Sequence, residues 1–364
     1  MIAVIADDFT GAAELAGISL RYGLKAEVCL NHIIKKEADV IIVCTNSRSM
    51  TNGDALSATA EVIKNILKLN PSILYKKIDS VLRGHVIDEV KLQMQIMKKN
   101  KAMILPANPS LKRTISNGEY HIDGKKITES DFVNDPEFPV TSSFISKMIS
   151  NEDVTIKSHE DKLPENGMVI GEITTVEDLD KWAAVIDNSW MLAGAGDFFA
   201  ALLKRNYKQE KQPEINLQSP FLYVCGTAFE ESKQYISRLN NEQGCVSYLP
   251  EIVTDEWLNK TVGIIEDQNK VIIAIDESPS DALSLRMAMA NVVKKIVQQK
   301  NIKEIYIEGG STSAAVLAEL NIKTLQPVNE LSRGVVRMKA DDLLITVKPG
   351  SYQLPEAIKR LFTI

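Results

Sequence analysis

The sequence has few cysteines and few histidines, with four of each among its 364 residues. Cys29, Cys44, Cys225 and Cys245 are far apart in the chain and form no CxxC pair, and the first three lie in apolar runs. Buried, reduced thiols are the expected state of such residues. Because no histidines and cysteines cluster, the sequence gives no sign of a structural zinc site.

The chain also has no excess of positive charge and no long apolar run. Its 42 Lys and Arg are outnumbered by 48 Asp and Glu, giving a net charge of −6. This balance argues against nucleic acid or an anionic lipid surface as a partner. Apolar runs such as Val40–Cys44 and Val271–Ile275 are as long as strands and too short for a bilayer. The start of the chain lacks the basic region of a signal peptide, so we expect a cytoplasmic protein.

Short apolar runs alternate with helical patterns along most of the chain, which predicts an α/β fold with mainly parallel sheets. The expected strands include Ile2–Ala6, Ala26–Leu30, Val40–Cys44, Ile73–Lys77, Ala102–Pro106, Met168–Gly171, Trp190–Ala193, Phe221–Cys225, Val246–Leu249, Val271–Ile275, Glu304–Glu308 and Leu343–Val347. The polar, proline-containing segment Asn206–Pro220 is the best linker. We therefore expect two α/β domains, residues 1–211 and 219–364, with an inter-domain cleft.

Residues 107–143 interrupt the α/β pattern with a polar stretch rich in Gly, Pro, Asn and Asp. Within it, Tyr120–Ile122 and Lys126–Thr128 flank Asp123-Gly124, a favourable two-residue hairpin turn. A long ordered segment of this kind is either functional or a hairpin without a role.

Ligands of open α/β sheets bind at the carboxyl ends of the strands, so the residues after each strand are the candidate site residues. In the first half these are Asp7 and Asp8, then Arg48, and then Lys77, Asp79, Ser80 and Arg83. Arginine forms bidentate pairs with carboxylates and phosphates, while Asp and Ser bind hydroxyls. The set predicts a pocket for a small hydroxylated acid. The alternative is that both aspartates only cap a helix and that the arginines are exposed to solvent. The DDxT spacing excludes a DxDxT phosphatase nucleophile.

The loops of the second half point to a phosphate or nucleotide site. Gly226-Thr227 follows one strand, Gly309, Gly310, Ser311 and Thr312 follow another and open a helix, and Lys348 and Gly350 come after the last strand. Glycines allow close backbone approach, and helix N-termini and hydroxyls donate hydrogen bonds to anionic oxygens. The chain contains neither a Walker A motif nor GxGxxG.

A separate motif, Gly194-Ala195-Gly196-Asp197, resembles the GAGD of ribokinase-type sugar kinases, in which the Asp is the general base. The usual preceding Asp-Thr is absent, and no early Gly-Gly signature is visible. The alternative is a strand-to-helix turn with a capping Asp.

The motifs taken together resemble those of the four-carbon acid sugar kinases. Ile5–Ala12 (IADDFTGA) resembles the opening of that family, and Lys76–Gly84 resembles its KKIDSTLRG motif, with Val81 in place of Thr. Further matching segments are Leu105–Ala107, Lys112–Thr114, Gly118, Gly124, Asp135–Val140, Gly226-Thr227, Gly309–Thr312 and Lys348–Gly350. Two departures are Ser311, where the family has an acidic residue, and Thr227, where it has Ser. Glu308 is a candidate substitute for the missing acid.

The resemblance implies an N-terminal domain that binds a four-carbon sugar acid and a C-terminal domain that binds ATP. The acid would be threonate, erythronate or an oxo-tetronate, phosphorylated on its 4-hydroxyl. We expect Asp8, with Asp7 as the alternative, to accept the hydroxyl proton, Arg48 and Arg83 to grip the carboxylate or the phosphoryl group, and Lys348 to neutralise phosphate charge. Mg²⁺ would arrive with ATP, held by phosphates and waters. A non-catalytic sugar-acid sensor is the competing hypothesis, and a homodimer is the default oligomer.

Overall fold

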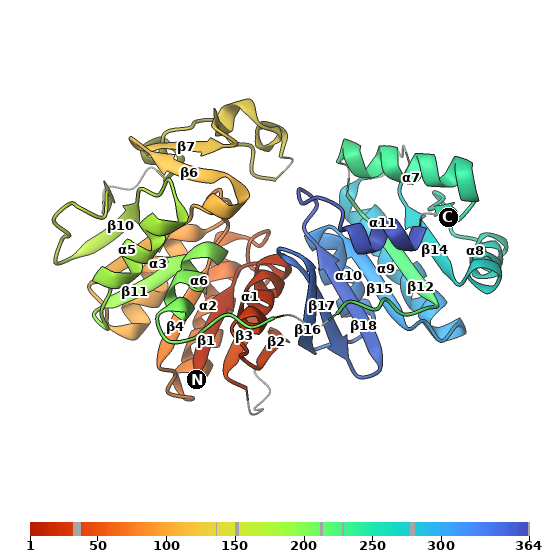
Figure 1. The fold of residues 1–364 in the computed structure, drawn as a ribbon, viewed down its shortest axis with the longest axis horizontal. Coiled ribbons are helices and arrows are strands. Elements are labelled where there is room, and N and C mark those ends of the chain that lie inside the picture. The colour runs from red at the N-terminus through yellow and green to blue at the C-terminus, as the bar shows by residue number, and fades with distance from the viewer. Residues whose placement is uncertain are drawn as a thin grey trace. The chain divides into compact units, whose positions relative to one another are not determined.

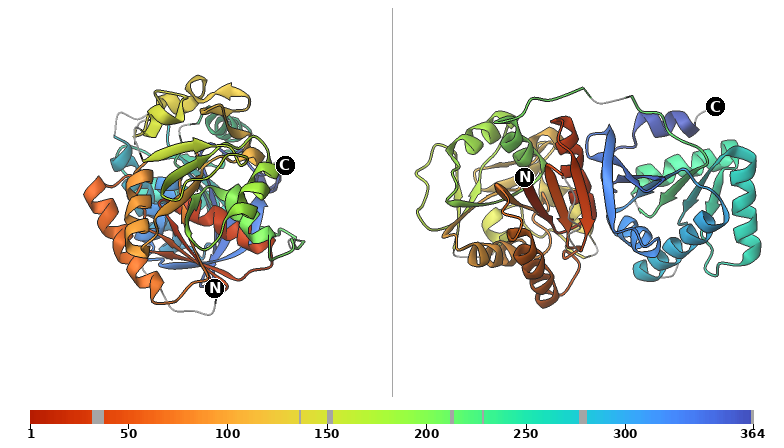
Figure 2. Two further views of the ribbon diagram at one scale, coloured as in Figure 1. Left: turned by 90° about the vertical axis from the view of Figure 1, so that its left-hand side faces the viewer. Right: turned by 90° about the horizontal axis from the view of Figure 1, so that it is seen from below.

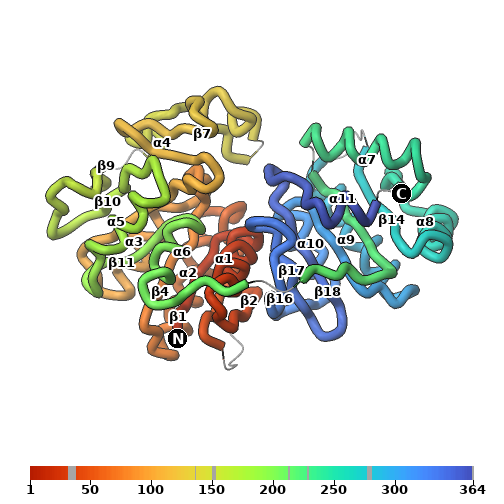
Figure 3. The backbone as a smooth tube through the Cα atoms, viewed as in Figure 1, coloured from red at the N-terminus to blue at the C-terminus, as the bar shows by residue number. Residues whose placement is uncertain are grey.

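The computed structural model describes residues 1–31, 38–135, 137–149, 153–211, 214–227, 229–276 and 281–362. The chain divides into two compact units, Met1–Glu210 and Lys211–Ile364, each described by itself (Figure 1). The division falls inside the polar segment that the sequence predicts as a linker. Residues 212–213 of that segment lie outside the described residues, and the backbone trace of Figure 3 follows the rest of it without helix or strand between α6 and β12.

The first unit is built on a sheet with the strand order β2-β3-β1-β4-β11-β5-β10-β9, and each of these pairings is parallel. The strands are β1 (Ile2–Ala6), β2 (Ala26–Leu30), β3 (Val40–Cys44), β4 (Ile73–Lys77), β5 (Lys101–Leu105), β9 (Val154–Lys157), β10 (Gly167–Gly171) and β11 (Trp190–Gly194). Both faces of the central strands are covered, which explains why β1 and β3 are continuous apolar runs. The predicted parallel α/β fold is confirmed.

Helices cover both faces of this sheet, as the left-hand view of Figure 2 shows. They are α1 (Phe9–Arg21), α2 (Asn52–Leu67), α3 (Val86–Met97), α5 (Val176–Val185) and α6 (Gly196–Lys204). Helix α2 buries Val62, Ile63 and Ile66 against Ala3 and Ile5 of β1. This burial of one apolar stripe holds the helix on the sheet and leaves the strand ends free for polar loops.

The segment between β5 and β9 forms a small hairpin subdomain, which we call the inserted segment (residues 107–149). It contains β6 (Arg113–Ser116), β7 (Glu119–Ile122), β8 (Lys125–Lys126) and α4 (Ile145–Ile149). Asp123 and Gly124 have φ values of 51° and 77°, the geometry of the predicted two-residue turn, which is confirmed. Ile115 and Tyr120 are fully buried, and Ile115 exchanges two backbone hydrogen bonds with Ile173, which joins the segment to the chain after β10.

The second unit has the strand order β13-β14-β12-β15-β18-β17-β16. Its strands are β12 (Phe221–Cys225), β13 (Val246–Tyr248), β14 (Lys270–Ala274), β15 (Glu304–Glu308), β16 (Thr324–Ser332), β17 (Val335–Ala340) and β18 (Leu343–Lys348). Strands β16, β17 and β18 pair antiparallel, whereas the other pairs are parallel. The sequence pattern does not predict β16 and β17, because polar residues and Pro327 interrupt their apolar alternation.

The helices of the second unit are α7 (Glu230–Gln243), α8 (Asp255–Gln268), α9 (Ala282–Gln299), α10 (Gly310–Glu319) and α11 (Glu356–Phe362). Helices α7 and α11 share an apolar cluster with β12, to which Ile236, Phe362 and Tyr223 contribute. Within the described residues, no helix is both long and apolar enough to span a membrane.

Candidate active site

The polar loops of the first unit start from one edge of the sheet. Ala6, at the end of β1, pairs with Cys44 at the end of β3 and with Lys77 at the end of β4. The loops that follow these three residues therefore leave the sheet side by side. The backbone N–H of Thr45 donates to Ala6 (2.9 Å), and that of Arg48 donates to the carbonyl of Asp7 (3.2 Å). The topology rule thus brings the predicted residues of the first half together.

Arg48 is the centre of this group. Its Nε and Nη2 donate to the two carboxylate oxygens of Asp7 at 2.8 and 3.0 Å, and Nη2 also donates to Asp8 Oδ1 at 2.8 Å. Its Nη1 lies 3.6 Å from Asp79 Oδ1. Gly84, with φ of 83°, passes so close that a Cβ there would lie 3.0 Å from Arg48 Cγ. A glycine is needed at this position because of both the left-handed backbone and the contact.

Asp8 occupies the N-cap of α1. Its carboxylate accepts from the backbone N–H of Gly11 at 3.0 Å and from the hydroxyl of Thr10. Burial acts to raise the pKa of Asp8, but Arg48, Lys77 and the Thr10 hydrogen bond outweigh burial and lower it. The side chain is therefore ionised at neutral pH and placed at a helix N-terminus, where an anion is stabilised.

Asp7 differs from its neighbour. It is 3% exposed, and burial dominates over the attraction of Arg48, so that the pKa of Asp7 is raised. Its two oxygens are both occupied by Arg48. Asp7 thus holds the guanidinium of Arg48 with both of its carboxylate oxygens.

Asp79 forms a second carboxylate–guanidinium pair, with Arg83. Arg83 Nε and Nη2 donate to the two oxygens of Asp79, both at 2.9 Å. The remaining amino group, Nη1, donates to Asp135 of the inserted segment at 2.7 Å. The arginines that the sequence predicts as substrate clamps are thus both already paired with aspartates of the protein.

The Asp79 pair predicts an acid-sensitive contribution to stability. Burial alone would raise the pKa of Asp79, but Arg83 and then Arg48 hold it well below the ordinary value of 3.8. A lowered folded-state pKa stabilises the protein above the unfolded value, and this contribution disappears as the pH falls toward the folded value. Asp79→Asn should cost on the order of 2 kcal/mol at pH 7 and flatten the loss of stability below about pH 4. Urea unfolding between pH 7 and pH 2.5 measures this, and an unchanged slope would contradict it.

Arg113 is a site residue that the prediction did not select, although its Lys-Arg-Thr motif is visible in the sequence. Its Nη1 donates to the hydroxyl of Ser80. Its guanidinium carbon lies 5.4 Å from the ring centre of Phe132, and that of Arg83 lies 5.1 Å from the same ring. The inserted segment therefore supplies both a cation and an aromatic ring to the edge of the sheet, which no local pattern would reveal.

Lys77 and Asp197 belong to a buried polar network behind Asp8. The ammonium of Lys77 lies 3.3 Å from Glu14, whose Oε1 accepts from Asn108 at 3.2 Å. Asn108 in turn accepts from the backbone N–H of Asp197 at 2.8 Å. The Asp197 carboxylate accepts from both the backbone and the hydroxyl of Ser110 (2.9 and 2.7 Å). Asp197 thus tethers the inserted segment, a structural role that the ribokinase-like alternative did not include.

In the second unit, the predicted loops also converge on one edge of a sheet. Cys225 pairs with Glu308, which pairs with Lys348, so the three following loops are neighbours. A Cβ on Gly226 would lie 2.0 Å from Thr312 Oγ1, and a Cβ on Gly350 would lie 2.8 Å from Thr227 Oγ1. Gly309 has φ of 110° and precedes α10, which begins at Gly310. We call this group of loops the glycine cradle.

Ser311 is exposed in the first turn of α10, whereas Thr312 is buried against Gly226. Phe229 is an addition to the predicted set, because its side chain is 40% exposed beside Gly350. The cradle thus combines backbone N–H groups, hydroxyls and an exposed aromatic ring.

Lys348 and Glu308 lie beneath the cradle. The Lys348 ammonium pairs with Glu308 at 2.9 Å and donates to the carbonyls of Pro349 and Gly350 at 3.0 and 3.1 Å and to that of Tyr352. Glu308 also accepts from Tyr223 and Ser232, and it is fully buried. Lys348 therefore holds the loop after β18 through hydrogen bonds to its backbone carbonyls. Because Glu308 is buried, it does not take the place of the acidic residue that the family has at the position of Ser311.

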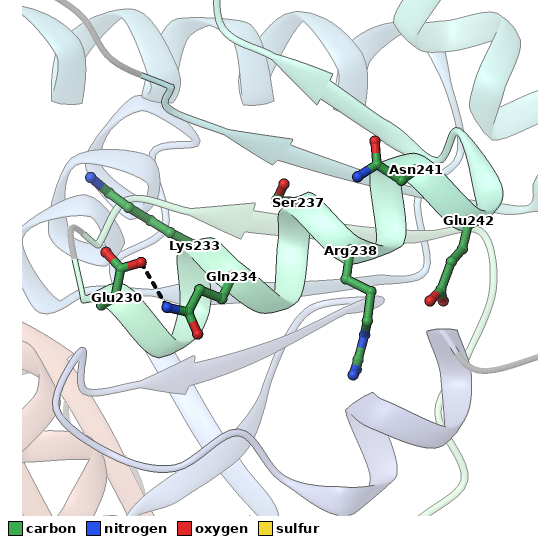
Figure 4. Close-up of a pocket in the computed structure, with 7 residues that line it drawn as sticks. All are labelled: Glu230, Lys233, Gln234, Ser237, Arg238, Asn241 and Glu242. Atoms are coloured by element: carbon green, nitrogen blue, oxygen red, sulfur yellow. Dashed lines mark hydrogen bonds between the residues drawn. The ribbon is translucent and has the colours of Figure 1, made fainter.

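The second unit also has a surface hollow on α7. The shallow hollow in Figure 4 is lined by side chains of α7 alone, among them Glu230, Gln234 and Arg238. Glu230 and Gln234 bond to each other at 2.9 Å, as expected on a solvated helix face. In the part of the chain that the structure describes, no three His, Cys, Asp or Glu side chains form a group that could hold a metal ion.

Comparisons with known proteins agree with this division of the chain. Residues 2–202 match the family model described as a sugar-binding N-terminal domain, and residues 251–352 match a nucleotide-binding C-terminal domain. A D-threonate kinase from Salmonella typhimurium is 25% identical, over 96% of this chain and 94% of its own length. A 3-oxo-tetronate kinase from Pseudomonas fluorescens is 20% identical, over 97% of this chain and 94% of its own. A solved Haemophilus influenzae protein of the DUF1537 family has the same fold, with a TM-score of 0.76 and 17% identity over 99% of this chain and 98% of its own.

Proposed function

We infer that the chain, which belongs to the four-carbon acid sugar kinase family, is a kinase of this kind. We propose that it transfers the terminal phosphoryl group of ATP to the 4-hydroxyl of a four-carbon sugar acid. Threonate, erythronate and oxo-tetronates are the candidate acceptors. The observation that carries the proposal is the pair of strand-end sites: a carboxylate–arginine group in the first unit and the glycine cradle in the second. The non-catalytic sensor is not favoured, because relatives aligned over nearly their whole length are named as kinases.

In this proposal Asp8 is the proton acceptor. It is ionised at neutral pH, and its Oδ1 and Oδ2 are oriented by Gly11 and Thr10. The acceptor hydroxyl attacks the terminal phosphorus, the bond from phosphorus to the ADP oxygen breaks, and the hydroxyl proton moves to Asp8. A carboxylate with a lowered pKa is a weak base, which suits a loose transition state in which the proton leaves late.

The remaining polar groups of the first unit position the substrate and the proposed base. Arg48 holds Asp7 and Asp8 in place. Asp79 and Ser80, which follow β4, would bind the substrate hydroxyls, whereas Lys77 pairs with Glu14 behind Asp8. Water must be kept from replacing the sugar acid as acceptor, a task that the predicted inter-domain cleft would serve. The cleft itself and a homodimer both stay predictions.

The glycine cradle would bind ATP through Gly226, Thr227 and Gly309–Thr312. The absence of a Cβ at Gly226 and Gly350 lets the side chains of Thr312 and Thr227 lie close against these loops. The N-terminus of α10 favours the negative charge of a phosphate. Mg²⁺, which would neutralise phosphate charge, would be held by phosphates and water.

The proposal is tested by measuring ADP release with ATP and a panel of the threonate and erythronate isomers and their oxo forms. Turnover with at least one acid is expected. A thermal shift with an acid but no ADP release from any of them would instead support the sensor. Activity that survives Asp8→Asn but not Asp197→Asn would support the ribokinase-like mechanism.

Gly226→Ala tests the glycine cradle. The added methyl would collide with Thr312, so we expect the affinity for ADP to fall at least about 10-fold and stability to fall by about 1–3 kcal/mol. Gly263→Ala, in the interior of α8 with open space around it, is the matched control and should bind ADP normally. Calorimetric titration with ADP measures both. Unchanged affinity in Gly226→Ala would remove the cradle from nucleotide binding.

A further inference from the structure

The charges around Asp8 leave the predicted substrate clamps without a free cation. Four aspartate carboxylates bind Arg48 and Arg83: Asp7, Asp8, Asp79 and Asp135. Two guanidinium groups thus face four carboxylates. Lys77 does not change this balance, because it pairs with Glu14. A sugar acid brings a further negative charge, which a group with this excess of carboxylates would repel.

Arg113 differs from Arg48 and Arg83 in the partners of its guanidinium. Its Nη1 donates to Ser80, and its guanidinium lies against Phe132. Among the residues that the structure describes, no carboxylate lies within ion-pair distance of it, in contrast to Arg48 and Arg83. A guanidinium has five N–H donors in a planar fork that fits a carboxylate with two parallel hydrogen bonds. One bond to a serine hydroxyl leaves most of this capacity for a ligand.

The backbone holds Arg113 in place independently of its side chain. Asn108 and Arg113 exchange two backbone hydrogen bonds, at 3.0 and 3.1 Å. The side chain of Asn108 is in turn bonded to Glu14 and to the backbone of Asp197. The root of the inserted segment is therefore anchored in the polar network behind Asp8, and the guanidinium is fixed beside Ser80 before any ligand arrives.

From this juxtaposition we propose that Arg113 binds the carboxylate of the substrate, and that the inserted segment is the element that selects acids over neutral polyols. The inference rests on the proposed function. Arg48 and Arg83 then act as positioning residues for Asp8 and Asp79. The hydroxyls of the acid face Ser80 and Asp79, and the Phe132 ring lies within cation–π range of the Arg113 guanidinium, at 5.4 Å.

The test compares Arg113→Ala with the wild-type protein on the best four-carbon acid and on the neutral tetritol of the same configuration, in which CH₂OH replaces the carboxylate. We expect the KM for the acid to rise on the order of 100-fold, as for the loss of a charge-assisted bidentate contact, and the KM for ATP to stay within a few-fold. The ratio of kcat/KM for acid over tetritol should fall by the same order. Arg113→Lys keeps the charge but loses the planar fork of donors, so its KM for the acid and its ratio should lie between those of the wild-type protein and of Arg113→Ala.

Lys112→Ala is the matched control, because Lys112 is the adjacent cation and pairs with Asp123 at 2.7 Å on the surface. It should change neither KM nor the ratio. An Arg113→Ala protein that loses acid and tetritol turnover equally would show a structural role and overturn the inference. If Arg113→Ala fails to fold, the acid-to-tetritol ratio of Arg113→Lys decides, and an unchanged ratio counts against the inference. A wild-type protein that phosphorylates no four-carbon acid would instead overturn the proposed function.

Discussion

Asp8→Asn should lower kcat by about 10²–10⁴-fold, the usual contribution of a general base. The amide cannot take up the hydroxyl proton, but it can still accept from the backbone N–H of Gly11. Asparagine is as good an N-cap as aspartate, so α1 should keep its start and the protein its fold. The KM for the sugar acid should change only a few-fold. Steady-state measurement of ADP release, with a thermal melt of both proteins, checks the expectation.

The matched control for Asp8→Asn is Asp281→Asn. Asp281 caps α9 in the second unit, where its carboxylate accepts from the backbone N–H groups of Leu283 and Ser284, both at 3.0 Å. It has the same capping role without the neighbouring arginine. Normal turnover in Asp281→Asn and a collapse in Asp8→Asn would separate proton transfer from capping. Near-normal turnover in Asp8→Asn would remove Asp8 from the role of base.

Arg48→Ala should lower the free energy of unfolding by about 3–5 kcal/mol, because it leaves buried carboxylates without their shared partner. Asp7 and Asp79 are each 7% exposed or less, and Arg48 itself is only 15% exposed. Arg48→Lys should cost less, since it keeps the charge while losing the fork that holds Asp7 with two bonds. Urea unfolding at pH 7 measures both variants.

Lys91→Ala is the comparison for Arg48→Ala. Lys91 pairs with Asp153 at 2.8 Å, but the two side chains are 36% and 66% exposed. Such a surface pair contributes about 0–1 kcal/mol. If the two alanine variants lose the same stability, the carboxylates around Arg48 are better solvated than their burial indicates, and the central role of Arg48 would be wrong.

The sequence was a good guide to the strands that carry the site. Ranges for β1, β3 and β4 agree with the structure to the residue. Strands β1 and β3 are unbroken apolar runs, as expected of buried parallel strands, whereas β4 ends on Lys76 and Lys77. The sequence reading did not predict helices α8 and α9. The apolar stripe of α8, formed by Leu258, Val262 and Ile265, is narrow and mixed with polar residues. The strand-end rule then placed Asp8, Arg48 and Asp79 at one edge without any knowledge of loop geometry.

The partners of these side chains could not be predicted in the same way. The place of Arg48 depends on its close contact with Gly84, whose φ is 83°. The contact of Arg113 with Ser80 depends on the inserted segment folding back onto the sheet edge. Local propensity determines neither, because both follow from contacts between segments far apart in the sequence.

The pairs around Arg48 form a continuous row of alternating charge: Asp8, Arg48, Asp79, Arg83 and Asp135. Its one end is the proposed base, and its other end belongs to the inserted segment. By thermodynamic linkage, a change at either end of this row alters the proton affinity of the carboxylate at the other end. Removal of the Asp135 carboxylate would leave Arg83 to Asp79 alone, so that Arg48 would bind Asp7 and Asp8 more strongly and hold the pKa of Asp8 lower. Sequence variation in the inserted segment therefore offers evolution a way to adjust the proton affinity of the proposed base, which the segment does not touch.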